Sequence, residues 1–138
     1  MTFSRDVPRG KRRILEYAVE ALDYLRDLPA DWDGDGAEPV TDTACLAAVE
    51  FLAAITDIDT VPPQVVPLAT GGVQLEWLVA AHDLEIEFGP DGTAHILGSD
   101  AEGKITIDSQ VNGVIGAANH DEVRDRLRRL ALPLTDVG

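Results

Sequence analysis

The spacing of apolar residues changes at Gly71, and this change constrains the fold more than any other feature of the sequence. Before Gly71 the apolar residues of two segments recur every three or four positions, whereas after it they alternate with polar residues. The first spacing is typical of one face of a helix, and the second is typical of a strand with one buried face. The sequence therefore predicts an α+β fold in which helices precede a sheet.

Two helices are expected before the change and one near the C-terminus. The first spans Arg12–Leu28 and ends before Pro29, and the second begins at Thr41 or Asp42, either of which can cap a helix. A loop rich in Asp and Gly joins these two helices. Residues 120–130 begin with acidic and end with basic side chains, which suits the dipole of a third helix.

Between the helices, alternation predicts an antiparallel meander sheet of four to five strands. The strands are expected over residues 73–79, 84–88, 93–97 and 104–108, with a further short strand over 111–115. Residues 57–67 contain three prolines, so they predict a connector with at most an edge strand. The two N-terminal helices should pack on the sheet, and the C-terminal helix should close one side.

The chain of 138 residues is long enough for one core, and its 45% hydrophobic content predicts a single domain over residues 14–138. Residues 1–13 form a basic N-terminal arm. No apolar run approaches the length of a membrane span, so we expect a cytoplasmic protein with no membrane contact. Cys45 is the single cysteine, and its apolar neighbours indicate a buried, unreactive thiol.

The net charge of −14 is unevenly distributed along the chain. Residues 1–13 carry a charge of +4, residues 14–110 carry −18 and residues 111–138 are neutral. Such a body repels nucleic acid and attracts basic proteins, so we expect a basic protein partner and no direct contact with nucleic acid. Adaptation of a whole proteome to salt or to high GC content would produce the same acidity.

Two motifs occur together in the sequence. Residues 32–39 read WDGDGAEP and residues 71–77 read GGVQLEW. Over roughly residues 25–97, the chain resembles a group of small uncharacterised bacterial proteins with WDG-x-GA-x-P and GG-x-QLEW signatures. No activity comes with this resemblance. Because some members look like products of mobile or defence-associated loci, the resemblance implies an interaction protein such as an antitoxin-like partner.

The loop after the first helix offers a possible calcium site. Asp31, Asp33 and Asp35 occupy positions 1, 3 and 5 of a calcium loop, with Gly36 at position 6. The residues at positions 8 and 9 do not fit that motif. The favoured interpretation is a structural connection whose glycines permit positive φ, with calcium as the alternative.

The strands offer a second candidate site. The turn Gly89–Gly92 predicts that Glu87 faces His95, and a turn over residues 80–83 predicts that Glu76 faces Glu87. Glu76, Glu87 and His95 would then align across three strands and could hold a transition metal or act as an acid–base pair. A register error would destroy this alignment.

Three interpretations of this sheet face follow. It is a solvated charged face, a metal site, or a recognition surface on which Glu76, Glu85 and Glu87 bind a basic partner. Among the functional interpretations we prefer the last, because it agrees with the charge of the chain and depends only on the shared strand face. The sequence thus favours a non-enzymatic, antitoxin- or immunity-like protein that needs no cofactor. A small metal-dependent enzyme or metal-binding domain is the alternative.

Overall fold

The computed structural model describes residues 9–56, 62–79, 81–111 and 121–127. Its elements are two helices, α1 (Arg9–Arg26) and α2 (Asp42–Ile55), and five strands. The strands are β1 (Gln64–Pro67), β2 (Val73–Val79), β3 (His82–Phe88), β4 (Ala94–Ser99) and β5 (Ile105–Val111). A short helical segment follows over residues 121–127. The α+β fold predicted from the sequence is confirmed.

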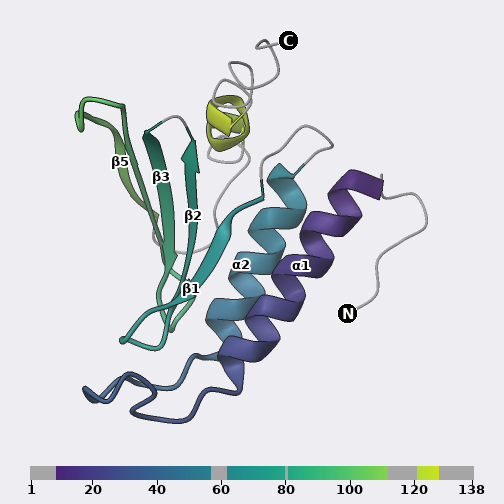
Figure 1. The fold of residues 1–138 in the computed structure, drawn as a ribbon, viewed down its shortest axis with the longest axis vertical. Coiled ribbons are helices and arrows are strands. Elements are labelled where there is room, and N and C mark those ends of the chain that lie inside the picture. The colour runs from purple at the N-terminus through teal and green to yellow at the C-terminus, as the bar shows by residue number, and fades with distance from the viewer. Residues whose placement is uncertain (1–8, 57–61, 80, 112–120, 128–138) are drawn as a thin grey trace.

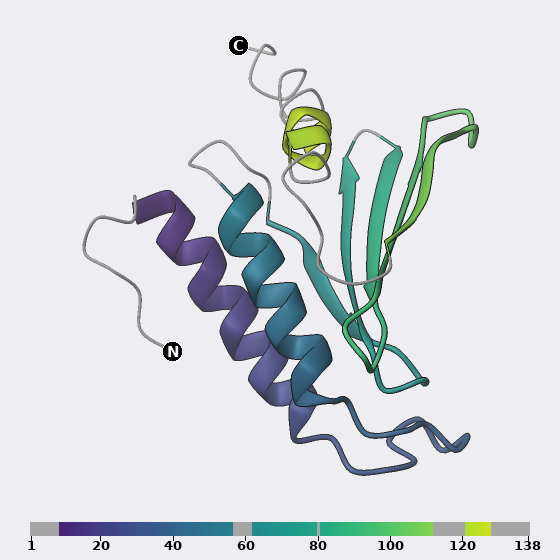
Figure 2. The same cartoon turned by 180° about the vertical axis from the view of Figure 1, so that it is seen from behind.

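All five strands form one antiparallel sheet in the order β1-β2-β3-β4-β5, so each strand pairs with its neighbour in the chain. α1 and α2 lie together along one face of this sheet (Figures 1 and 2), and α2 contacts β2 and β3. We call the helix-covered side the inner face and the opposite side the outer face. β1 is the edge strand that the proline-rich connector allows.

The core forms because the apolar positions of the helices and strands meet between the two layers. Strand residues 73, 75, 77 and 79 are buried while those between them are not, as the alternating pattern predicts. Trp77 is 1% exposed, and the ring of Phe51 on α2 packs edge-on against Phe88 of β3 at a centroid distance of 5.8 Å. Together these contacts fix which face of the sheet points towards the helices.

The ends of the helices differ in part from the sequence expectation. Thr41 is the N-cap of α2, as predicted, because its Oγ1 accepts a hydrogen bond from the backbone N–H of Ala44 at 3.1 Å. α1 begins at Arg9, so the last residues of the basic arm belong to this helix. The remaining residues of the arm, 1–8, lie outside the described residues, as do 112–115 of the further strand predicted over 111–115.

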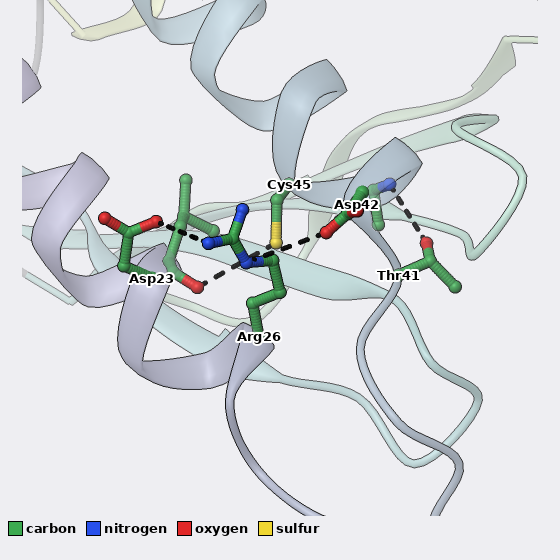
Figure 3. Close-up of polar contacts among 7 residues, drawn as sticks. Asp23, Arg26, Thr41, Asp42 and Cys45 are labelled. Carbon is green, nitrogen blue, oxygen red and sulfur yellow. Dashed lines mark hydrogen bonds and ion pairs between the residues drawn. The ribbon is translucent and has the colours of Figure 1, made fainter. Parts of the chain in front are cut away.

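Side chains at the junction of the two helices tie α1 to α2 (Figure 3). Arg26 near the end of α1 lies 3.6 Å from carboxylate oxygens of both Asp23 and Asp42. Cys45 is buried beside them, and its Sγ donates to the carbonyl of Leu22 at 3.9 Å. The predicted burial of Cys45 is confirmed, and this burial raises the pKa of its thiol, which disfavours the reactive thiolate form.

No helix within the described ranges combines the length and the apolar character needed to cross a bilayer.

Candidate functional site: the acidic outer face of the sheet

The outer face carries the polar residues of the alternating strands. Its members on the four longest strands are Gln74, Glu76, Leu78, Asp83, Glu85, Glu87, His95, Leu97, Ser99, Ile105, Asp108 and Gln110. None of the five strands contains lysine or arginine. This face is therefore strongly acidic, and His95 is the only one of these residues whose side chain can carry positive charge.

The predicted pairing of β3 with β4 is confirmed. Glu87 lies opposite His95, and Phe88 lies opposite Ala94. The turn that sets this register holds Gly92 at φ +87°, and its backbone closes through the N–H of Gly89, which donates to the carbonyl of Thr93 at 2.7 Å. The Pro-Asp-Gly sequence has the turn chemistry that such a hairpin needs.

The predicted pairing of β2 with β3 is wrong by two residues. Glu76 lies opposite Glu85, and Gln74 lies opposite Glu87. The cause is a shorter turn: Val79 pairs with His82, so only two residues separate the strands, and Ala81 takes the left-handed conformation with φ +66°. The row Glu76–Glu87–His95 expected from the sequence is therefore not formed, although all three residues share the outer face.

The structure brings together a different group of carboxylates. Oxygen atoms of Glu76, Asp83 and Glu85 all lie within 4.8 Å of one another. We call these three residues the carboxylate cluster. No other group of three potential metal ligands meets in the parts of the chain that the structure describes. Three hard oxygen donors of this kind suit a divalent cation such as Ca²⁺ or Mn²⁺, or the head of a basic side chain.

The surroundings of the carboxylate cluster disfavour the charged form of Glu85. Desolvation raises the pKa of Glu85 to about 7, and its hydrogen bond with Glu76 and repulsion from Asp83 act in the same direction. One oxygen of Asp83, Oδ1, is buried and has no hydrogen-bond partner. A buried acceptor without a donor costs free energy, so a positively charged donor placed here would relieve both penalties.

His95 makes its closest polar contact away from that cluster. Its Nε2 lies 2.6 Å from Oδ1 of Asp108 on β5, and Glu87 faces it from β3. His95 thus sits between two acidic residues of neighbouring strands. The Glu87 and His95 pair expected from the sequence is present, whereas Glu76 belongs to the neighbouring row.

In the loop considered as a possible calcium site, the carboxylates of Asp31 and Asp33 accept hydrogen bonds from backbone amides. Oδ1 of Asp33 accepts hydrogen bonds from the N–H groups of Asp35 and Ala37, at 2.9 and 3.1 Å, and Oδ1 of Asp31 accepts one from Gly36 at 2.6 Å. Gly34 and Gly36 adopt φ values of +73° and +84°. These contacts fit the structural interpretation of the loop, in which Asp side chains replace backbone partners.

Sequence reasoning missed Asp83 and the apolar residues beside it. It placed His82 in a turn, but His82 opens β3, and this earlier start puts Asp83 on the outer face next to Glu85. Leu78 and Ile105 are 68% and 58% exposed, and the row Leu78–Asp83–Ser99–Ile105 crosses one end of the sheet. The alternation of the strands could have indicated Leu78, since it breaks the polar pattern of that face.

Comparisons of the chain with family models, with curated proteins and with solved structures find no match.

Proposed function

We propose that the protein is a non-enzymatic interaction protein whose acidic outer face binds and neutralises a basic protein, in the manner of an antitoxin or immunity protein. Glu76, Glu85 and Glu87 form the centre of the binding surface. The observation that carries the proposal is the charge of this face, where acidic residues from three strands gather without a lysine or arginine on any strand.

Apolar residues of the same face, the exposed Leu78 and the half-buried Leu97, support a protein partner. Leu78 lies diagonal to Glu85, and Leu97 lies directly opposite Glu85 on β4. Protein interfaces combine apolar contact area with charged groups that set specificity and association rate. A basic protein with apolar side chains near its Arg or Lys residues would complement both features.

The partner can supply what the carboxylate cluster lacks. An Arg or Lys head group placed there offers hydrogen-bond donors to three carboxylates, including the unpartnered oxygen of Asp83. The positive charge also favours the ionised form of Glu85. Binding should then release protons near neutral pH, because the pKa of Glu85 falls from about 7 when a cation approaches it.

The test is capture of the partner from the native host with the tagged full chain at low salt. The variant Glu76→Lys/Glu85→Lys/Glu87→Lys reverses the charge of the outer face. The matched control Glu16→Lys/Glu20→Lys/Glu50→Lys makes the same change of net charge on exposed positions of the helices. Circular dichroism and thermal melting confirm that each variant is folded.

The wild type and the helix control should retain a stoichiometric basic protein that dissociates as salt rises, and the outer-face variant should lose it. Retention of the partner by the outer-face variant would contradict the proposal. Equal loss from both variants would indicate that only the net charge matters. A wild-type protein without any stoichiometric partner would also contradict the proposal and favour the second candidate.

The second candidate is a divalent-cation site in the carboxylate cluster, favoured by the 4.8 Å grouping of Glu76, Asp83 and Glu85. The group lacks nitrogen and sulfur donors, so Ca²⁺ or Mn²⁺ fits it better than a softer metal. Titration of the chelator-free protein with CaCl₂ and MnCl₂, followed by calorimetry, tests this candidate. Saturable binding that Glu85→Gln abolishes and Glu87→Gln preserves would support it, and absence of binding would exclude it.

A further inference from the structure

The two edges of the sheet differ in how they are protected. β1 has four residues, ends in Pro67 and follows Pro62 and Pro63. Short strands and prolines are devices that prevent another strand from adding to an edge. β5 has seven residues, contains no proline, lysine or arginine and includes the β-branched residues Ile105, Thr106 and Ile107. One edge is thus blocked, and the other retains the composition of a strand that accepts a neighbour.

Part of β5 already makes hydrogen bonds to another segment of the chain. Arg126, in the helical segment 121–127, donates hydrogen bonds to the carbonyl and the hydroxyl oxygen of Thr106, at 3.0 and 3.1 Å. Beyond Thr106, no strand among the described residues pairs with the side of β5 that faces away from β4. Because successive residues of an antiparallel strand direct their backbone groups to opposite sides, alternate residues within 107–111 present their N–H and C=O groups on that side.

Charge determines what can pair there. Asp108 is the middle residue of β5, its side chain is 59% exposed, and it ends the row Glu76–Glu85–Leu97–Asp108 across the outer face. Its Oδ1 already contacts Nε2 of His95 at 2.6 Å, so a further cation would share this carboxylate with His95. A second copy paired antiparallel about the middle of β5 would place Asp108 opposite Asp108, and like charges directly opposed are destabilising. A strand with a basic residue at this position would instead extend the row with an opposite charge.

We propose that residues 107–111 of β5 receive an extended segment of a basic protein as a sixth strand, with Lys or Arg opposite Asp108. This inference rests on the proposed function, because it names the part of the basic partner that docks and the place where it docks. The backbone groups of β5 provide affinity for any extended segment, and Asp108 selects a basic one. The glutamates of the outer face then contact the folded body of the partner.

Two peptides serve as probes: acetyl-TVTKTVT-amide, with lysine at its centre, and the counterpart acetyl-TVTETVT-amide. Each is added to the ¹⁵N-labelled full chain, and amide hydrogen exchange and chemical shifts are measured by NMR. The same titrations are made with Asp108→Lys, which reverses the charge, and with Asp108→Asn, which removes the charge and keeps the size of the side chain.

The lysine peptide should slow the exchange of amides within residues 107–111 and bind the wild type about fivefold more tightly than the glutamate peptide. Asp108→Lys should reverse this order, and Asp108→Asn should make the two peptides nearly equal. Equal binding of both peptides to the wild type, or protection only outside β5, would overturn the inference. Protection that grows with protein concentration without peptide would identify a second copy as the occupant and would overturn it as well.

The peptide titrations test docking at β5, and the capture of the partner tests the proposed function, so either result can be negative without the other. Protection of β5 by the lysine peptide supports docking at the edge even if capture does not depend on Glu76, Glu85 and Glu87. If capture depends on these glutamates and neither peptide protects β5, the proposed function stands and the strand addition is wrong.

Discussion

Glu76 and Glu85 face each other across β2 and β3; desolvation raises the pKa of Glu85, and its hydrogen bond with Glu76 and the nearby Asp83 raise it further. Two carboxylates in this arrangement share a proton more readily than they carry two charges. The outer face therefore contains a group that changes charge near neutral pH, in a protein whose proposed partner is recognised by charge.

Glu85→Gln should stabilise the protein at high pH. The folded protein holds a proton on Glu85 up to about pH 7, whereas the ordinary pKa is 4.5, so wild-type stability falls as pH rises between these values. The variant avoids this loss, and because solvent screens the partly exposed Glu85, it should gain only roughly 1 kcal/mol at pH 8 and almost nothing at pH 4. Urea unfolding at both pH values measures the effect. Glu87→Gln is the control for removing a charge from the same face, and an equal gain there would refute the explanation.

Gly72→Ala should destabilise the sheet by about 2–4 kcal/mol. A Cβ at Gly72 would lie 2.1 Å from the carbonyl oxygen of Phe88, which belongs to the backbone of β3 and cannot move aside. Gly103→Ala is a suitable control, because a Cβ there meets nothing within 4 Å and only the φ of +81° is unfavourable. Thermal unfolding should show a loss for Gly103→Ala of about 1 kcal/mol. Similar losses in both variants would contradict the role of close packing at Gly72.

Thr41→Ala should lower the free energy of unfolding by about 1–2 kcal/mol, since it removes two contacts of one hydroxyl group. The Oγ1 caps α2 through Ala44 and donates to the carbonyl of Pro90, at 2.8 Å, in the turn between β3 and β4. Thr41→Ser retains the hydroxyl and should lose less than half as much. Chemical denaturation of both variants makes the comparison, and equal losses would assign the effect to the methyl group.

Asp33→Ala should cost about 1 kcal/mol, because Oδ1 of Asp33 accepts from the N–H groups of Asp35 and Ala37. Asp33→Asn keeps an acceptor and should cost less. Calcium at millimolar concentration should change the melting temperature of the wild type no more than that of Asp33→Asn, since these bonds already occupy that oxygen. A rise in melting temperature with calcium that Asp33→Asn abolishes would restore the calcium interpretation of this loop.

The two hairpins that flank β3 show how far the sequence predicts this site. The turn at Gly89–Gly92 has Pro, Asp and Gly at positions that define its geometry, so the pairing of Glu87 with His95 could be derived. Residues 80 and 81 are both alanine, and alanine gives no indication in the sequence that Ala81 adopts a positive φ. The sequence therefore predicts a turn over residues 80–83, whereas in the structure only residues 80 and 81 separate the two strands.

That error had a limited consequence because the side chains of a strand alternate with a period of two. The shift of two residues pairs Glu76 with Glu85 instead of Glu87, and it leaves Glu76, Glu85 and Glu87 on their predicted face. The shared face of Glu76, Glu85 and Glu87 was thus predictable, whereas the carboxylate cluster with Asp83 was not, since it depends on the register itself. The inner layer was easier to predict, because burial of residues such as Trp77 depends only on that alternation.

The lack of lysine on the strands also decides how a complex of this protein can be captured chemically. The chain has two lysines, Lys11 in α1 and Lys104 in the β4–β5 turn, so amine-reactive crosslinkers have no attachment point on the strands of the outer face. A carbodiimide acts on carboxyl groups and joins them directly to amines. The glutamates of this surface would then form crosslinks to the lysines of a bound protein. Each crosslinked lysine would identify a part of that protein that lies beside the outer face.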